Sequence, residues 1–219
     1  MTSCARRVLA VGVDAARGGW IAVALEDGAF ADAALERRLA AVIERFPDAE
    51  AFGVDVPVGL PPPGERRRAD VEARRGAGPR RSSVFFTPSR EALEAPTYAA
   101  ARAVAPETSA QGWALRTAIL DAARVDDSRL HEVHPEVSFA VLGGEPLVFA
   151  KRTWNGQHER ARLLVKAGIK LPDRLDAGIV SADDVLDATV AAWTATRIAG
   201  GEHRTLPSDP GQGEPVIHA

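Results

Sequence analysis

The chain has 219 residues, of which 46% are hydrophobic and 26% are charged, which suits one domain with a buried core and is short for two. A formal charge of -3 gives no global attraction to nucleic acid, whose binding depends on phosphate neutralisation. The single cysteine, Cys4, excludes an internal disulfide framework and a cysteine-rich zinc site. A metal ion would therefore need oxygen or histidine ligands.

The sequence gives no sign of membrane insertion or secretion. It has no run of about eighteen apolar residues that could span a bilayer. Its first residues lead into a strand pattern, without the layout of a signal peptide. We expect a soluble, cytoplasmic protein with no membrane contact, in which Cys4 has no functional partner.

The first part of the chain predicts three strands, a helix and a fourth strand. Residues 8–14 (VLAVGVD) form an apolar run that ends in a carboxylate, which is typical of a buried strand. Gly-containing turns separate it from two further strands at 20–25 and 29–33. Apolar residues at three- and four-residue steps predict a helix over 35–46, and 51–56 (AFGVDV) restarts a buried strand.

The second part predicts helices, one strand and a capped final helix. Helical patterns cover about 91–104 and 107–123, residues 129–139 alternate as a fifth strand, and 155–167 form a charged helix. Ser181 and Asp184 form a capping box for a helix over 182–199. We expect one α/β domain over residues 1–200, with a mixed five-stranded sheet flanked by helices, and a loop or disordered tail over 201–219.

Carboxylates gather at positions that the predicted sheet would bring together. Asp14 ends the first strand and Asp55 ends the fourth, so they meet at one edge if these strands are neighbours. Asp184 and Asp187 lie on the last helix, and Glu136 follows the fifth strand's histidines. Such acids repel one another unless a cation neutralises them, and Mg²⁺ or Mn²⁺ prefers oxygen ligands. Two such ions can activate water and stabilise the leaving oxygen of a phosphodiester.

Each acid also has a structural interpretation. An aspartate at a strand end is often a turn former. Asp183 and Asp184 fit the first turn of a helix, where they favour the cap and the dipole. Glu136 is equally compatible with a surface acid beside a satisfied His134. Asp187 is past the first turn and has apolar neighbours, so a structural role explains it least well.

Basic residues provide candidate phosphate ligands. Seven arginines fall within residues 66–81, a concentrated source of positive charge, although a solvated helix face explains them too. The candidate substrate-binding residues are Arg68, Arg74, Arg81, Lys151 and Arg160.

The ordered segments VGVDAARGGW, GVDVPVGLP, SSVFFTPSR, HEVHPEVSF, KRTWNGQHER and DDVLDATVAAW resemble the domain-of-unknown-function family 429 over about residues 8–199. That family is described as predicted nucleases with an RNase H-like fold. The resemblance implies metal ligands at Asp14, Asp55, Asp184 and Asp187, with Glu136 and Arg68 as further motif positions. In one departure from the family pattern, Ala69 replaces the cysteine that often precedes Asp70.

These observations favour an Mg²⁺- or Mn²⁺-dependent nuclease that acts on DNA or RNA, with Asp14, Asp55, Asp184, Asp187 and Glu136 as catalytic residues. One alternative is an actin-like phosphotransferase or nucleotide hydrolase, because GVDAARGG weakly resembles a phosphate-binding hairpin. Another is a nucleic-acid-binding module without catalysis. The apolar SVFFTP segment is compatible with a homodimer or with packing inside one subunit.

Overall fold

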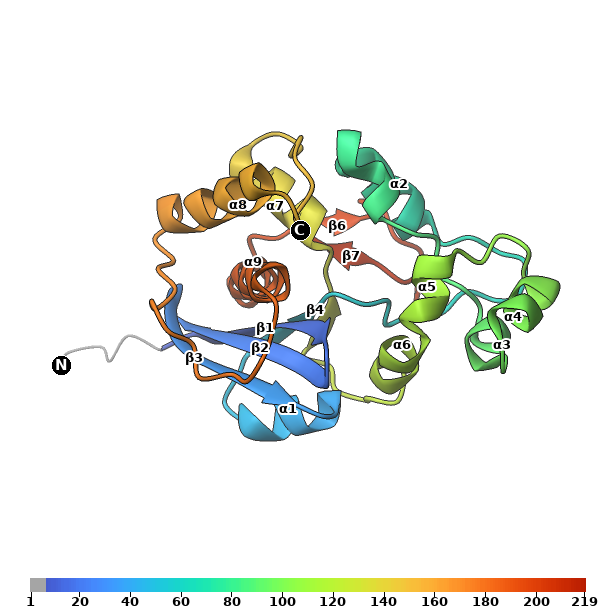
Figure 1. Cartoon of the computed structure of the whole chain (residues 1–219), viewed down its shortest axis with the longest axis horizontal. Coiled ribbons are helices and arrows are strands. Elements are labelled where there is room, and N and C mark those ends of the chain that lie inside the picture. The colour runs from blue at the N-terminus through green and yellow to red at the C-terminus, as the bar shows by residue number, and fades with distance from the viewer. Residues whose placement is uncertain (1–6) are drawn as a thin grey trace.

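A five-stranded mixed sheet forms the centre of residues 7–219, which the computed structural model describes; Cys4 lies outside them (Figure 1). The strand order is β3-β2-β1-β4-β5, with β1, β2 and β3 antiparallel to one another in turn and β1, β4 and β5 parallel. This arrangement confirms the predicted fold class and is consistent with an RNase H-like architecture. The strands are β1 (Leu9–Ala16), β2 (Gly19–Glu26), β3 (Ala29–Glu36), β4 (Ala51–Val54) and β5 (Leu130–Glu132).

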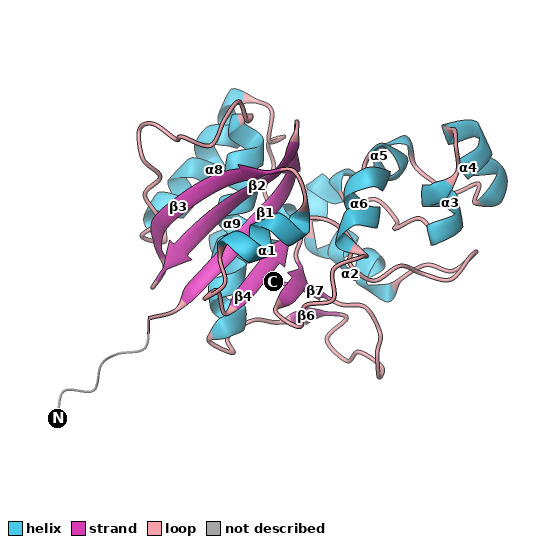
Figure 2. Ribbon diagram, turned by 90° about the horizontal axis from the view of Figure 1, so that it is seen from below, coloured by secondary structure: helices cyan, strands magenta, loops and turns pink. Residues whose placement is uncertain are grey.

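Helices cover both faces of the sheet (Figures 1 and 2). On one face, Ile21 of β2 packs in a core cluster with Phe139 and Leu164, which come from helices beside α9. On the other face, Val13 of β1 packs with Leu39 of α1. None of the described helices combines the length and apolarity that a membrane crossing requires. The covering helices are α1 (Leu39–Arg45), α6 (Arg116–Ala122), α7 (Pro135–Gly143), α8 (Trp154–Lys166) and α9 (Ala182–Ala199).

A long insertion connects β4 to β5 and extends to one side of the sheet (Figure 2). Its residues line part of the cavity next to the ends of β1 and β4, so the insertion limits access to those strand ends. Before α6, it contains α2 (Arg68–Gly76), the 3₁₀ helix η1 (Gly78–Ser83), α3 (Arg90–Glu94), α4 (Tyr98–Val104) and α5 (Ala110–Ala114).

Several predicted boundaries differ from the structure. The third strand continues to Glu36, because Leu35 pairs with Ile21 in the sheet, so the first helix begins at Leu39. The two long helices predicted over 91–104 and 107–123 are each divided into two. The predicted strand over 129–139 ends at Glu132, because Pro135 begins α7, where a proline's missing N–H costs nothing.

The final helix has the predicted bounds, and the Ser181 hydroxyl accepts a hydrogen bond from the Asp184 backbone N–H at 3.2 Å. The segment that follows differs from the expected loop or disordered tail. It contains β6 (Thr205–Leu206) and β7 (Ile217–His218), and His218 bridges to Val133 beside β5. Ile217 is only 2% exposed, so burial of apolar side chains docks this segment against the domain.

Candidate metal centre

The same tripeptide, Gly-Val-Asp, occurs at the ends of two neighbouring parallel strands and places two carboxylates side by side. Residues 12–14 lie in β1, and residues 53–55 run along and out of β4. The two glycines are register partners, and the Asp55 N–H donates to the Val13 carbonyl at 2.9 Å. Because side chains alternate between sheet faces, Asp14 and Asp55 share the face of the two glycines, which α9 covers.

Helix α9 supplies the third carboxylate because it lies unusually close to the sheet. A Cβ atom on Gly12 would lie 2.0 Å from the Ala188 carbonyl oxygen, and one on Gly53 would lie 2.7 Å from that of Ala191. Only glycine permits this approach of helix backbone to strand backbone. Asp187 precedes Ala188 and lies one turn before Ala191, so the close packing holds it against the strand ends.

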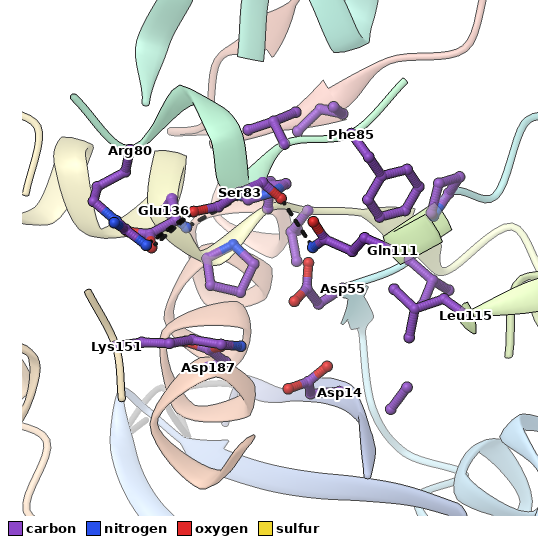
Figure 3. A pocket seen from close by; sticks show the side chains of 18 of the residues that line it. Asp14, Asp55, Arg80, Ser83, Phe85, Gln111, Leu115, Glu136, Lys151 and Asp187 are labelled. Atoms are coloured by element: carbon purple, nitrogen blue, oxygen red, sulfur yellow. Dashed lines mark hydrogen bonds and ion pairs between the residues drawn. The ribbon is translucent and has the colours of Figure 1, made fainter. Parts of the chain in front are cut away.

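Asp14, Asp55 and Asp187 form the carboxylate cluster (Figure 3). One oxygen from each of these side chains lies within 4.8 Å of the others, and Asp14 and Asp187 are only 6% and 2% exposed. Lys151 donates a short hydrogen bond to Asp187. Three ionised carboxylates and one ammonium leave two net negative charges, which one divalent cation balances. The donor set fits a cation that prefers oxygen ligands.

Burial and mutual repulsion make this cluster electrostatically costly without a metal. Burial raises the pKa of Asp14 well above its usual range, and the charge of Asp187 raises it further. Burial and then Asp14 do the same to the pKa of Asp55, and burial raises the pKa of Asp187 to about 6. Although burial opposes it, attraction from these carboxylates raises the pKa of Lys151, which stays protonated. A divalent cation would relieve the repulsion.

The cluster lies in a cavity of about 610 Å³, which we call the carboxylate cavity. The β4–β5 insertion forms the wall opposite the sheet, with Ser83, Phe85, Gln111 and Leu115 among its lining residues (Figure 3). The Gln111 side-chain amide donates to the Ser83 carbonyl at 3.3 Å and ties two parts of this wall together. The cavity has the size of a site for one small ligand or one extended segment of a larger one.

Asp184 and Glu136, the other two predicted acids, also line this cavity but lie apart from the carboxylate cluster. Arg160 donates to the Glu136 carboxylate at 2.6 Å, and Arg80 approaches it at 3.5 Å. Arg160 is 1% exposed and is committed to this ion pair, so the structure places it behind the cavity wall. Of the predicted cations, Lys151 is the one that lines the cavity.

The three predicted arginines of the cluster at residues 66–81 lie away from the carboxylates. Arg68 pairs with Asp209 and Glu214 and holds the C-terminal segment. Arg74 and Arg81 line a second, smaller cavity formed by α2, η1 and Phe86. None of these three arginines therefore lines the cavity that holds the carboxylate cluster.

Sequence reasoning missed a buried ion network beside the cavity. Arg67 is 6% exposed, pairs with both Asp70 and Glu132, and lines the cavity with them. Its neighbours in sequence are also arginines, and Glu132 is 65 positions away, so no local signal singles it out. The repeated Gly-Val-Asp tripeptide is the sequence feature from which the close packing of α9 on the two strands could have been predicted. His134 also lines the cavity, and burial lowers its pKa to about 4.

Comparison with known proteins identifies a family for almost the whole chain. The family model described as "Protein of unknown function (DUF429)" matches residues 12–212. No curated protein and no solved structure matches the chain. The matched region contains all three residues of the carboxylate cluster.

Proposed function

We propose that this chain, which belongs to the DUF429 family of proteins of unknown function, hydrolyses phosphodiester bonds of nucleic acid with Mg²⁺ or Mn²⁺. One observation carries the proposal: three carboxylates from β1, the end of β4 and α9 converge in an accessible cavity, and those of Asp14 and Asp187 are buried. Repulsion among buried acids costs free energy in the absence of a cation. The arrangement is explained if holding a divalent cation is its function.

In this proposal Asp14, Asp55 and Asp187 hold the cation. A divalent ion at this position would supply a Lewis acid that activates water and offsets charge on the phosphoryl group. Lys151 keeps a positive charge in the cavity and balances one carboxylate until substrate enters. Arg80, which approaches Glu136 at 3.5 Å, carries a further positive charge on the cavity wall, where its remaining N–H groups can bind the phosphate.

The size of the carboxylate cavity supports a second candidate, a phosphotransferase or hydrolase acting on a free nucleotide. A volume of about 610 Å³ is in the range of sites for single small molecules. A binding module without catalysis is disfavoured, because clustered negative charges repel the phosphates that such a module must attract. The two enzyme candidates share the metal centre and differ in substrate.

The test compares wild-type protein with an Asp14→Asn, Asp187→Asn double variant. An Asp173→Asn, Asp176→Asn variant is the matched control, because it removes two exposed carboxylates outside the cavity. Labelled single-stranded, duplex, hybrid and branched DNA and RNA, and separately ATP, are incubated with Mn²⁺, Mg²⁺ or EDTA. We expect metal-dependent cleavage of nucleic acid by the wild type and the control, and none by the Asp14→Asn, Asp187→Asn variant.

The other outcomes are equally informative. Metal-dependent turnover of ATP without cleavage of any nucleic acid would replace the nuclease proposal with the nucleotide candidate. Folded, metal-binding protein that turns over neither substrate would overturn both. Cleavage that persists in the Asp14→Asn, Asp187→Asn variant would show that the carboxylate cluster is not the catalytic centre.

A further inference from the structure

A second concave site lies along α2 and η1, and none of its lining residues belongs to the carboxylate cluster. It has a volume of about 390 Å³, and we call it the arginine groove. The residues that line it are Val71, Arg74, Arg75, Gly78, Arg81 and Phe86. Three of these six residues are arginines and none is acidic, so the groove attracts anions.

The positive charge of the arginine groove is largely uncompensated. In the described part of the chain, Arg75 and Arg81 enter no ion pair, and both side chains are exposed. Arg74 donates to the backbone carbonyl of Val84, which carries no net charge. Arg67, Arg68 and Arg80, by contrast, are each paired with a carboxylate. The free charges of this arginine-rich segment are therefore concentrated at the groove.

Phe86 orders the guanidinium groups around it. The guanidinium carbons of Arg66 and Arg74 lie 4.4 and 4.9 Å from the centre of its ring, within the range of cation–π interaction. Stacking on the ring limits the side-chain entropy lost on binding and leaves the N–H groups at the edge of the guanidinium available to oxygen acceptors, of which Arg74 uses one for the Val84 carbonyl. Such an arrangement suits phosphate oxygens.

One short segment separates the arginine groove from the carboxylate cavity. Arg80, Ser83 and Phe85 line the cavity, whereas Arg81 and Phe86, their direct neighbours in sequence, line the groove. Figure 3 shows Arg80, Ser83 and Phe85 around the carboxylate cavity. A polymer that places one phosphate at the carboxylates and passes this wall would meet the groove next.

We infer that the arginine groove binds backbone phosphates adjacent to the scissile one, so that the substrate is a single-stranded nucleic acid longer than one nucleotide. The inference rests on the proposed function for the chemistry at the carboxylates. A single strand suits this geometry because Asp14 and Asp187 are only 6% and 2% exposed, so the substrate must enter the carboxylate cavity, and a single strand is narrower than a duplex. A mononucleotide bound at the carboxylates would leave the groove without a role.

Binding and turnover are measured separately, so that the two proposals can fail independently. Fluorescence anisotropy with labelled single-stranded DNA and RNA oligonucleotides, in EDTA, reports binding without cleavage. The test variant is Arg75→Gln, Arg81→Gln, which leaves the structural contact of Arg74 intact. The control is Arg162→Gln, Lys166→Gln, which removes two exposed positive charges on α8, outside both cavities.

We expect the groove variant to bind oligonucleotides roughly tenfold more weakly, with the slope of log K against log salt reduced by about 1.4. The control should bind like the wild type. Turnover of a small activated diester, bis(p-nitrophenyl) phosphate, should be unchanged in the groove variant, because that substrate fits within the carboxylate cavity.

Wild-type protein that binds no oligonucleotide at low salt would overturn the inference, as would an unchanged salt slope in the groove variant. Weakened binding by the groove variant, without turnover of any substrate by the wild type, would support the groove and overturn the proposed hydrolysis. Equal binding of a mononucleotide and an oligonucleotide would assign the site to small nucleotides.

Discussion

Replacing Asp187 with asparagine should stabilise the metal-free protein and abolish its stabilisation by Mn²⁺. Burial raises the pKa of this carboxyl from 3.8 to about 6. At pH 7 that difference corresponds to about 3 kcal/mol of lost folding free energy. The attraction of Lys151 is already included, because it lowers the same pKa. For a protein of this size, removing the cost should raise the melting temperature by roughly 6–12 °C in EDTA.

The stability advantage of Asp187→Asn over the wild type should grow as pH rises. Because folding raises the pKa of Asp187, the folded protein holds this proton more tightly than the unfolded chain. Wild-type stability from this group therefore falls as pH rises from 3.8 to about 6 and is constant above that. The advantage of Asp187→Asn should be full at pH 7 and should vanish below pH 4.

Mn²⁺ should reverse the order of stability, so that the wild type melts at a higher temperature than Asp187→Asn. A ligand at one thousand times its Kd stabilises the folded state by about 4.1 kcal/mol, more than the roughly 3 kcal/mol lost to the buried charge, and the wild type should gain this stabilisation whereas the variant should not. Asp184→Asn is the matched control, because Asp184 lines the cavity on the same helix but lies outside the carboxylate cluster. Differential scanning calorimetry with EDTA and with Mn²⁺ measures each value. An Asp187→Asn variant that melts below the wild type in EDTA at pH 7, or that keeps the full Mn²⁺ shift, would refute the reasoning.

Gly12→Ala should destabilise the protein by about 1–3 kcal/mol and impair Mn²⁺ binding, because the added Cβ would overlap the Ala188 backbone. Gly76→Ala, whose Cβ meets its nearest neighbour at 3.7 Å, should instead stabilise by up to about 1 kcal/mol in urea unfolding. Calorimetry should show Mn²⁺ affinity increasing with pH above 5, because the proton on Asp187, with a pKa of about 6, must leave; a flat profile would argue against carboxylate ligation. Burial lowers the pKa of His218 to about 4, so its contribution to stability is full above pH 6.5 and is lost as pH falls towards 4. His218→Gln should reduce this acid-side slope by up to about 1.4 kcal/mol per pH unit, and an unchanged slope would exclude His218 as its source.

The sequence predicts the convergence of Asp14 and Asp55 because the necessary information is local. Apolar runs identify the strands, and the acids end them, so adjacency of the two strands suffices. No local pattern of this kind determines where the predicted basic side chains point. Whether an arginine faces a cavity, a carboxylate or solvent depends on partners far along the chain, as with Arg160 and Glu136. The docking of the C-terminal segment was also not predicted, because its Pro- and Gly-rich composition is typical of a loop and does not indicate that Ile217 is buried.

The fold divides the proposed chemistry and the proposed recognition between different parts of the chain. The carboxylate cluster belongs to β1, the end of β4 and α9, which are fixed by close packing of helix on sheet. The insertion between β4 and β5 supplies the opposite cavity wall and the whole arginine groove. Because the carboxylate cluster and the arginine groove share no residue, substitutions in the groove should change substrate affinity and salt dependence without changing the Mn²⁺-induced thermal shift. Substitutions at the packed glycines should change the Mn²⁺-induced shift and leave the charge of the groove intact.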